Sequence, residues 1–256
     1  MCRIIGFVSA KGGVGKTSII FHLANELSKK YRVCVFDTYF FMNDISERFA
    51  GSVGGDLKDY LTGELGTDNV LRKVRSNLYL VRTNENFDYL KHSELIKFFI
   101  SELSFRFDYI LIDINSFNFR VLNLMLCVST EIVYICTDDE LCVKNTAKLM
   151  VYIKNFTKAK SSKFILNKAR IIHMMRNKCL NVNDISELLK MDSLFVIPKF
   201  YINNNKSSEK IFLNNKNFIR KLSYSIITNK MCDYDIYKRY RGPFGYIRRI
   251  RCFKYE

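Results

Sequence analysis

One short stretch decides the fold of this 256-residue chain, namely Lys11-Gly12-Gly13-Val14-Gly15-Lys16-Thr17. It follows an apolar run at residues 4–8 and opens a helical apolar pattern at residues 19–24. A strand, a glycine-rich loop and a helix in this order are typical of a phosphate-binding loop, because glycines let backbone N–H groups surround phosphate oxygens and the helix N-terminus carries positive partial charge. We expect Lys16 to reach the β- and γ-phosphates of a nucleotide and the Thr17 hydroxyl to bind Mg²⁺. A glycine-rich turn before an ordinary helix is the alternative.

The rest of the chain alternates short apolar runs with helical patterns. Because the runs lack polar alternation, they predict strands that are buried on both faces of a mainly parallel sheet. Strands are expected at residues 4–8, 33–36, 78–81, 109–112, 131–135, 164–166 and 195–197, and helices at residues 17–30, 56–61, 68–74, 92–103, 141–156 and 217–230. The predicted fold class is therefore α/β, a mainly parallel twisted sheet with helices on both faces. Ligands of such sheets bind at the carboxyl ends of the strands, where the glycine loop, Asp37 and Asp113 all fall.

Length and composition indicate one globular domain. The chain is 48% apolar and 26% charged, and no apolar run approaches the roughly 20 residues that cross a bilayer. We expect a cytoplasmic protein with one domain over residues 1–235 and a separate basic tail over residues 236–256. The eight cysteines are scattered without metal-ligand spacing, which favours reduced, buried thiols.

A lysine in the glycine loop carries a resemblance to a known family. Ala10 stands where the usual loop has its first glycine, and Lys11 follows it. The sequence KGGVGKT resembles the deviant Walker A motif of the ParA/MinD family of P-loop ATPases. The resemblance implies that residues 11–18, Ser18 included, bind ATP or ADP with Mg²⁺. It also implies an ATP-dependent homodimer in which Lys11 reaches the partner's phosphates; a solvated lysine near the phosphates of its own subunit is the alternative.

Two acidic strand ends resemble the family's metal-binding positions. Residues 108–113 resemble the Walker B strand, in which Asp113 holds Mg²⁺. Asp37 opens what the family writes as Asp-x-Asp, so the resemblance gives it a metal-supporting and catalytic role beside Lys11 and Lys16. The second, water-positioning aspartate is replaced by Tyr39, and a phenol does not accept a proton as a carboxylate does. We therefore expect slow ATP hydrolysis or none, unless a neighbouring acid such as Asp44 substitutes.

Weaker resemblances concern the base and the cellular process. Asn167 resembles the family's adenine-contacting asparagine, and Pro198 resembles the proline that ends a strand near the base. Residues 56–64 resemble a helix and turn found in MinD and in the flagellar-number regulator FlhG. This branch implies control of flagellar placement or number, with a flagellar or division protein as partner. MinD-type division-site control, ParA-type DNA partition and a non-hydrolysing nucleotide-bound scaffold remain alternatives.

The basic tail is the second candidate site. The formal net charge is +16, and residues 236–255 contain seven Lys or Arg and no acid. As a helix, the tail is amphipathic, with an apolar arc beside basic side chains, and such helices lie on anionic membranes. It resembles the family's C-terminal membrane-targeting helix, which implies a peripheral location at the inner face of the cell membrane. The candidate membrane residues are Tyr246, Ile247, Arg248, Arg249, Ile250, Arg251 and Phe253. Nucleic-acid binding, which we favour less, and a disordered end are the alternatives.

Overall fold

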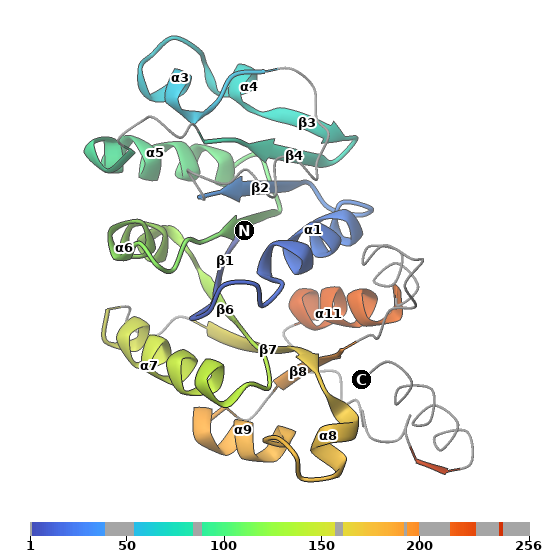
Figure 1. Ribbon diagram of the computed structural model, residues 1–256. Coiled ribbons are helices and arrows are strands. Elements are labelled where there is room, and N and C mark those ends of the chain that lie inside the picture. The colour runs from blue at the N-terminus through green and yellow to red at the C-terminus, as the bar shows by residue number, and fades with distance from the viewer. Residues whose placement is uncertain are drawn as a thin grey trace.

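The computed structural model describes residues 2–38, 54–83, 89–156, 161–191, 194–199, 216–228 and 241–242. Within these residues one mixed sheet runs through the molecule, with helices on its two faces (Figure 1). The strands are β1 (Arg3–Val8), β2 (Val33–Asp37), β3 (Arg72–Arg75), β4 (Leu78–Val81), β5 (Tyr109–Asp113), β6 (Glu131–Cys136), β7 (Ser161–Ala169) and β8 (Leu194–Pro198). The helices are α1 (Lys16–Leu27), α3 (Leu57–Leu61), α4 (Thr67–Val70), η1 (Tyr89–His92), α5 (Ser93–Ser104), α6 (Phe119–Val128), α7 (Glu140–Phe156), α8 (Ile171–Met175), α9 (Val182–Leu189) and α11 (Lys216–Thr228).

The sheet has the strand order β3-β4-β2-β5-β1-β6-β7-β8. Every neighbouring pair is parallel except β3 and β4, which are antiparallel. Helices α1 and α11 cover one face, and α5, α6 and α7 cover the other, as Figure 1 shows. The predicted α/β fold with a mainly parallel sheet is confirmed.

The central strands are continuous apolar runs in the sequence because both faces of the sheet are buried there. Every residue of β2, β5 and β6 is buried, including the charged residues at strand ends. Burial of each large apolar side chain contributes about 1.5–3 kcal/mol, so these central strands supply much of the driving force for folding. Among the described residues, no helix is long and apolar enough to cross a membrane.

The helix predicted at residues 68–74 is wrong in its second half. A short helix, α4, ends at Val70, and the chain then forms β3, an edge strand that pairs antiparallel with β4. The burial of β3 alternates between half-buried and exposed side chains, and that alternation is typical of a strand with one solvated face. Over so short a segment, the spacing of the apolar residues is compatible with a helix and with a strand. Pairing with β4 decides for the strand.

A cluster of charged side chains connects β1 with its neighbour β6, with β7 and with helix α11. The Arg3 guanidinium forms an ion pair with Glu131, with one N–O distance of 2.7 Å, and Lys163 lies 3.2 Å from the same carboxylate. Arg3 also donates to the backbone carbonyl of Ile226 in α11. Burial alone would raise the pKa of Glu131, but the hydrogen bonds and charges of Arg3 and Lys163 outweigh it and hold that pKa below its ordinary value.

We expect Glu131→Gln to lower the free energy of unfolding at pH 7 by about 2 kcal/mol, because two partly buried cations lose their counter-charge. The lowered pKa of Glu131 means that its contribution is present above the pKa of the unfolded state, about 4.3, and is lost as pH falls below it. Urea denaturation at pH 7 and pH 3.5 measures both effects. The exposed Glu140→Gln, on α7, is the matched control. An equal cost for Glu131→Gln at the two pH values would contradict the assignment.

Candidate functional site

The glycine loop joins β1 to α1 at the carboxyl edge of the sheet. Gly13 and Gly15 have positive φ angles of 70° and 91°, a region that L side chains avoid. A Cβ atom at Gly15 would also lie 2.5 Å from Nδ2 of Asn167, so this position accepts only glycine. A Cβ at Gly12 or Gly13 would meet no atom within 4 Å, so space lies open beside the backbone there. The loop has the shape that close approach of a phosphate requires.

The first turn of α1 meets the end of β5 beneath this loop. Lys16 and Asp113 are both buried, with side-chain exposures of 5% and 1%, and they form an ion pair. The Thr17 hydroxyl donates a hydrogen bond to Oδ2 of Asp113 over 2.8 Å. Parallel pairing of β1 with β5 places Asp113 opposite Phe7, close to the start of the loop. The three predicted side chains Lys16, Thr17 and Asp113 are therefore together.

A second carboxylate lies on the neighbouring strand. Asp37 ends β2, is 1% exposed and is the register partner of Asp113. Burial lowers the pKa of Lys16 to about 7, while the nearby Asp37 charge acts in the opposite direction. Thr38 links the two strand ends, because its hydroxyl donates to the Asp113 carbonyl over 2.7 Å and accepts from the Asn115 N–H over 2.8 Å. Thr38 has no signature in the sequence, because its role follows only from the pairing of β2 with β5.

Lys11 lies at the edge of the loop and contacts the segment after β6. Its ammonium is 3.5 Å from Oδ1 of Asp139, and both side chains are about half-exposed. Asp139 accepts the N–H of Cys142 over 2.9 Å in the first turn of α7. That hydrogen bond, and then the Lys11 charge, hold the pKa of Asp139 below its ordinary value, although burial opposes them. Asp139, which belongs to no sequence motif, is the ion-pair partner of Lys11 in this structure.

Two residues of β7 hold the glycine loop from the other side. The Asn167 amide donates to the Val14 carbonyl over 2.7 Å, and the Lys168 ammonium donates to the Gly13 carbonyl over 2.6 Å. Pro198 ends β8 and pairs with Ala169, so it lies at the same edge of the sheet. The structure therefore places Asn167 against the loop and Pro198 at the same edge of the sheet. Contact of either residue with adenine stays a prediction, and nothing in the sequence indicates the loop contact of Lys168.

Some predicted residues lie outside the described part of the chain. These are Tyr39, Asp44 and the tail residues from 243 onward, which include every candidate membrane residue. Ser18 lies in α1 directly after Thr17. Within the described residues, no group of three or more His, Cys, Asp or Glu side chains could hold a metal ion alone.

The residues present fit a nucleotide with a divalent cation. The Thr17 hydroxyl and the buried Asp113 carboxylate have oxygens 2.8 Å apart, next to a loop whose positive φ angles at Gly13 and Gly15 favour glycine. Mg²⁺ prefers oxygen ligands and uses one or two carboxylates together with phosphate oxygens, which matches this donor set. A buried ammonium at Lys16 and backbone N–H groups at the α1 N-terminus supply the positive charge that phosphates need. The site can therefore bind, orient and neutralise a polyphosphate.

Comparison with known proteins agrees with this geometry. Residues 5–231 match the CobQ/CobB/MinD/ParA nucleotide binding domain. The chain belongs to this family. Among characterised relatives of this CobQ/CobB/MinD/ParA domain, the septum site-determining protein MinD of Thermotoga maritima is 24% identical over 209 residues, which cover 77% of this chain and 76% of the relative.

Solved structures show the same fold. MinD from Pyrococcus horikoshii, complexed with Mg-ADP, has a TM-score of 0.65 and 24% identity, and covers 78% of this chain and 82% of its own. The MinC:MinD cell division protein complex of Aquifex aeolicus contains a chain with a TM-score of 0.74 and 17% identity, covering 91% of this chain and 99% of its own. At these identities the structural likeness establishes the P-loop fold of the family.

Proposed function

We propose that this protein is an ATP-dependent dimerisation switch of the MinD type that hydrolyses ATP slowly or not at all. The observation that carries this proposal is the convergence of Lys16, Thr17 and Asp113 beneath the glycine loop. In the proposal, Lys16 binds the β- and γ-phosphates, while Thr17 and Asp113 hold Mg²⁺ with support from Asp37. Bound Mg²⁺ would neutralise charge on the phosphates, and the chain's own side chains would orient them.

The proposed dimer uses the face that carries Lys11. That ammonium is half-exposed at the rim of the loop, so it can exchange Asp139 for a phosphate on a second copy. Phe117 and Leu141, which follow β5 and β6 at the same edge, are 59% and 63% exposed. Large apolar side chains exposed beside a charged site favour a protein partner there. A family relative whose solved structure is a MinC:MinD cell division protein complex supports a further protein partner for this chain.

The slow-hydrolysis part of the proposal rests on the sequence after β2. Asp37 is followed two residues later by Tyr39, where the family pattern has its water-positioning aspartate. A tyrosine hydroxyl has a pKa near 10 and stays protonated at neutral pH, so it does not serve as a general base. The nucleotide would then act chiefly as a long-lived dimer clamp.

In this proposal the switch acts at the inner face of the cell membrane and controls where a cellular structure is placed. In this proposal residues 1–235 form the switch and the basic tail from residue 236 contacts anionic lipid. A single short tail binds weakly, whereas two tails on one dimer bind by avidity. Flagellar placement or number follows from the resemblance at residues 56–64, and division-site control is the alternative that the MinD relatives favour.

A ParA-like partition function is the second candidate, because the net charge of +16 suits DNA as well as lipid. The third is a scaffold that keeps its nucleotide permanently.

Sedimentation with phosphatidylglycerol liposomes and retardation of duplex DNA distinguish the membrane-associated switch from a DNA partition protein. We expect the full-length protein with MgATP to sediment with these liposomes at least about tenfold more strongly than a chain truncated before Gly242, since each basic residue near the surface contributes about 1 kcal/mol.

Two controls sharpen this experiment. Lys11→Ala should lower MgATP-dependent sedimentation because it weakens the dimer, while the exposed Lys30→Ala removes the same charge away from the site and should not. Neutral phosphatidylcholine vesicles report binding that does not depend on charge. If truncation leaves liposome binding unchanged, or removes only DNA retardation, the membrane assignment is wrong and partition becomes the better proposal.

A further inference from the structure

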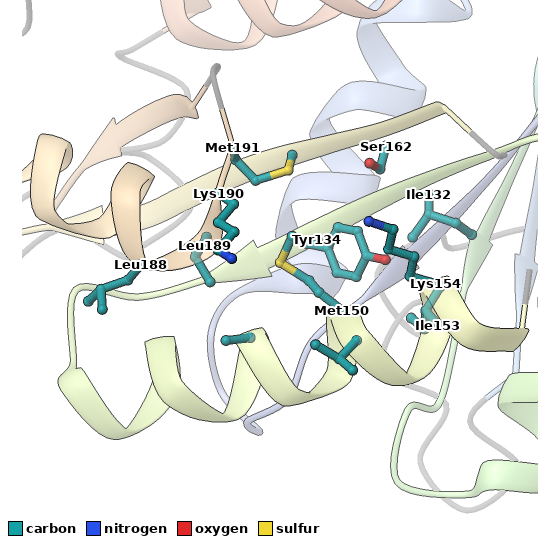
Figure 2. Close-up of a pocket in the computed structure, with 12 residues that line it drawn as sticks. Ile132, Tyr134, Met150, Ile153, Lys154, Ser162, Leu188, Leu189, Lys190 and Met191 are labelled. Atoms are coloured by element: carbon teal, nitrogen blue, oxygen red, sulfur yellow. The ribbon is translucent and has the colours of Figure 1, made fainter. Parts of the chain in front are cut away.

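A cavity of about 480 Å³ lies between α7, α9 and the strands β6 and β7 (Figure 2). Its volume is within the roughly 300–1,000 Å³ range of small-molecule pockets. Its walls are mainly apolar, with Met150 on α7, Leu189 on α9 and Met191 just after α9. Elements from three separate parts of the chain therefore enclose it.

The cavity lies on the α7 side of the sheet and extends toward the amino ends of β6 and β7, whereas the candidate nucleotide site lies at the carboxyl ends of the strands. Ile132 and Ser162, which line it, are the second residues of β6 and β7. The Asp139 turn that contacts Lys11 follows the other end of β6. Because parallel strands keep their amino ends at one edge of the sheet, this cavity and the glycine loop are separate sites.

One tyrosine hydroxyl faces the cavity. Tyr134 on β6 is 4% exposed and lines the space, and its hydroxyl makes no hydrogen bond to another described residue. Burial raises the pKa of Tyr134 above its ordinary value, so the hydroxyl is protonated and can donate. A hydroxyl that faces the cavity without a partner in the described protein can donate to a ligand oxygen there. This hydroxyl marks a polar point on an otherwise apolar wall.

Two cations complete the lining. Lys154 near the end of α7 and Lys190 directly after α9 are exposed, line the cavity and have no ion pair within the described part of the chain. In Figure 2 the Lys154 side chain extends beside the Tyr134 ring, and Lys190 lies next to Leu189. No Asp or Glu lines the cavity. The charge of the lining is therefore positive only.

We propose that this cavity binds a single-chain amphipathic carboxylate of the fatty-acid class, with its alkyl chain against Met150, Leu189 and Met191 and its headgroup at Lys154 and Lys190. The apolar walls suit an alkyl chain, whose burial contributes about 0.8 kcal/mol per CH₂. The lysines and the Tyr134 hydroxyl are donors that suit a carboxylate. The chain's own basic tail is a poor occupant, because its charge has the same sign as the lining.

Methionine methyl NMR with dodecanoate tests this proposal. In protein labelled at the methionine methyl carbons, we expect the Met150 and Met191 signals to shift saturably at one dodecanoate per chain. Met174, buried in α8 away from the cavity, is the internal reference and should not shift. Dodecyltrimethylammonium has the same chain with a cationic headgroup, and we expect it to bind at least about tenfold more weakly.

Variants distinguish the part of the cavity that binds the alkyl chain from the part that binds the headgroup. Lys154→Gln with Lys190→Gln should weaken dodecanoate binding about tenfold, because two charge contacts to the headgroup are lost. Lys148→Gln with Lys178→Gln removes equal charge from exposed lysines outside the cavity and should change nothing. Ala147→Phe, on the α7 wall, should abolish binding by filling the space while both lysines stay. Thermal unfolding checks that each variant is folded.

Several results would overturn the proposal. These are the absence of any saturable shift at Met150 and Met191, equal binding of the carboxylate and the ammonium, and unchanged binding in the lysine double variant. A shift of Met174 together with the others would indicate general detergent binding, and it would also count against a specific site.

Discussion

Lys16→Ala is expected to weaken MgATP binding at least 100-fold and to abolish any conversion of ATP to ADP. The substitution removes the buried ammonium that the structure holds beside Asp113 under the glycine loop, so the phosphates lose their main point charge. It also leaves the Asp113 carboxylate buried with the Thr17 hydroxyl but without its cation, which makes binding of an anion less favourable still. Equilibrium binding of MgATP by calorimetry measures the first effect.

A single-turnover experiment measures the second effect. Protein is mixed with equimolar MgATP, and bound ATP and ADP are quantified over time. Lys30→Ala, at an exposed site after α1, is the charge-matched control and should behave as the unmodified chain. Thermal unfolding of Lys16→Ala separates loss of the site from loss of the fold. Tight MgATP binding by a folded Lys16→Ala protein would show that the nucleotide lies elsewhere.

Tyr39→Asp is expected to raise the rate of ATP hydrolysis by about 10²-fold, the lower end of what a positioned general base contributes. The substitution restores the carboxylate that the family pattern has two residues after Asp37. Tyr39→Phe removes only the hydroxyl and should leave the slow rate unchanged. Steady-state phosphate release at saturating MgATP measures all three proteins.

A fast rate of ATP hydrolysis in the unmodified chain would contradict this prediction. If that rate is fast and Tyr39→Asp does not change it, another acid positions the water. Asp44→Asn then tests the nearest alternative named by the sequence. If Tyr39→Asp binds MgATP tightly and still fails to hydrolyse it, the scaffold proposal gains support, and the search moves to protein partners.

Much of the candidate nucleotide site could be predicted from the sequence, because it is built from local patterns. Glycines at positions 13 and 15 followed by Lys16 and Thr17 specify a loop and a helix N-terminus within a few residues. Apolar runs that end in Asp37 and Asp113 specify buried strands with acids at their carboxyl ends. Parallel pairing then brings those ends to one edge, so the meeting of Lys16, Thr17 and Asp113 follows from the fold class.

Contacts between distant segments could not be read from the sequence. Asn167 and Lys168 hold the glycine loop across about 150 residues, and Thr38 links the ends of β2 and β5. Asp139 holds Lys11 only because β6 lies next to β1 in the sheet. Such side chains have no periodic signature, since their partners are chosen by strand order and not by spacing along the chain.

The sequence by itself therefore determined the fold class, the phosphate-binding loop and the acids at the strand ends, because each depends on residues that are neighbours in the chain. Only the tertiary structure decided that residues 72–75 form an edge strand, which residues support the loop, and that a cavity lies between α7 and α9. Strand pairing and helix packing bring together residues whose separation along the chain carries no information about their contact. The physical reason is that hydrophobic burial selects one arrangement of the whole sheet, and the contacts between its distant parts follow from that arrangement.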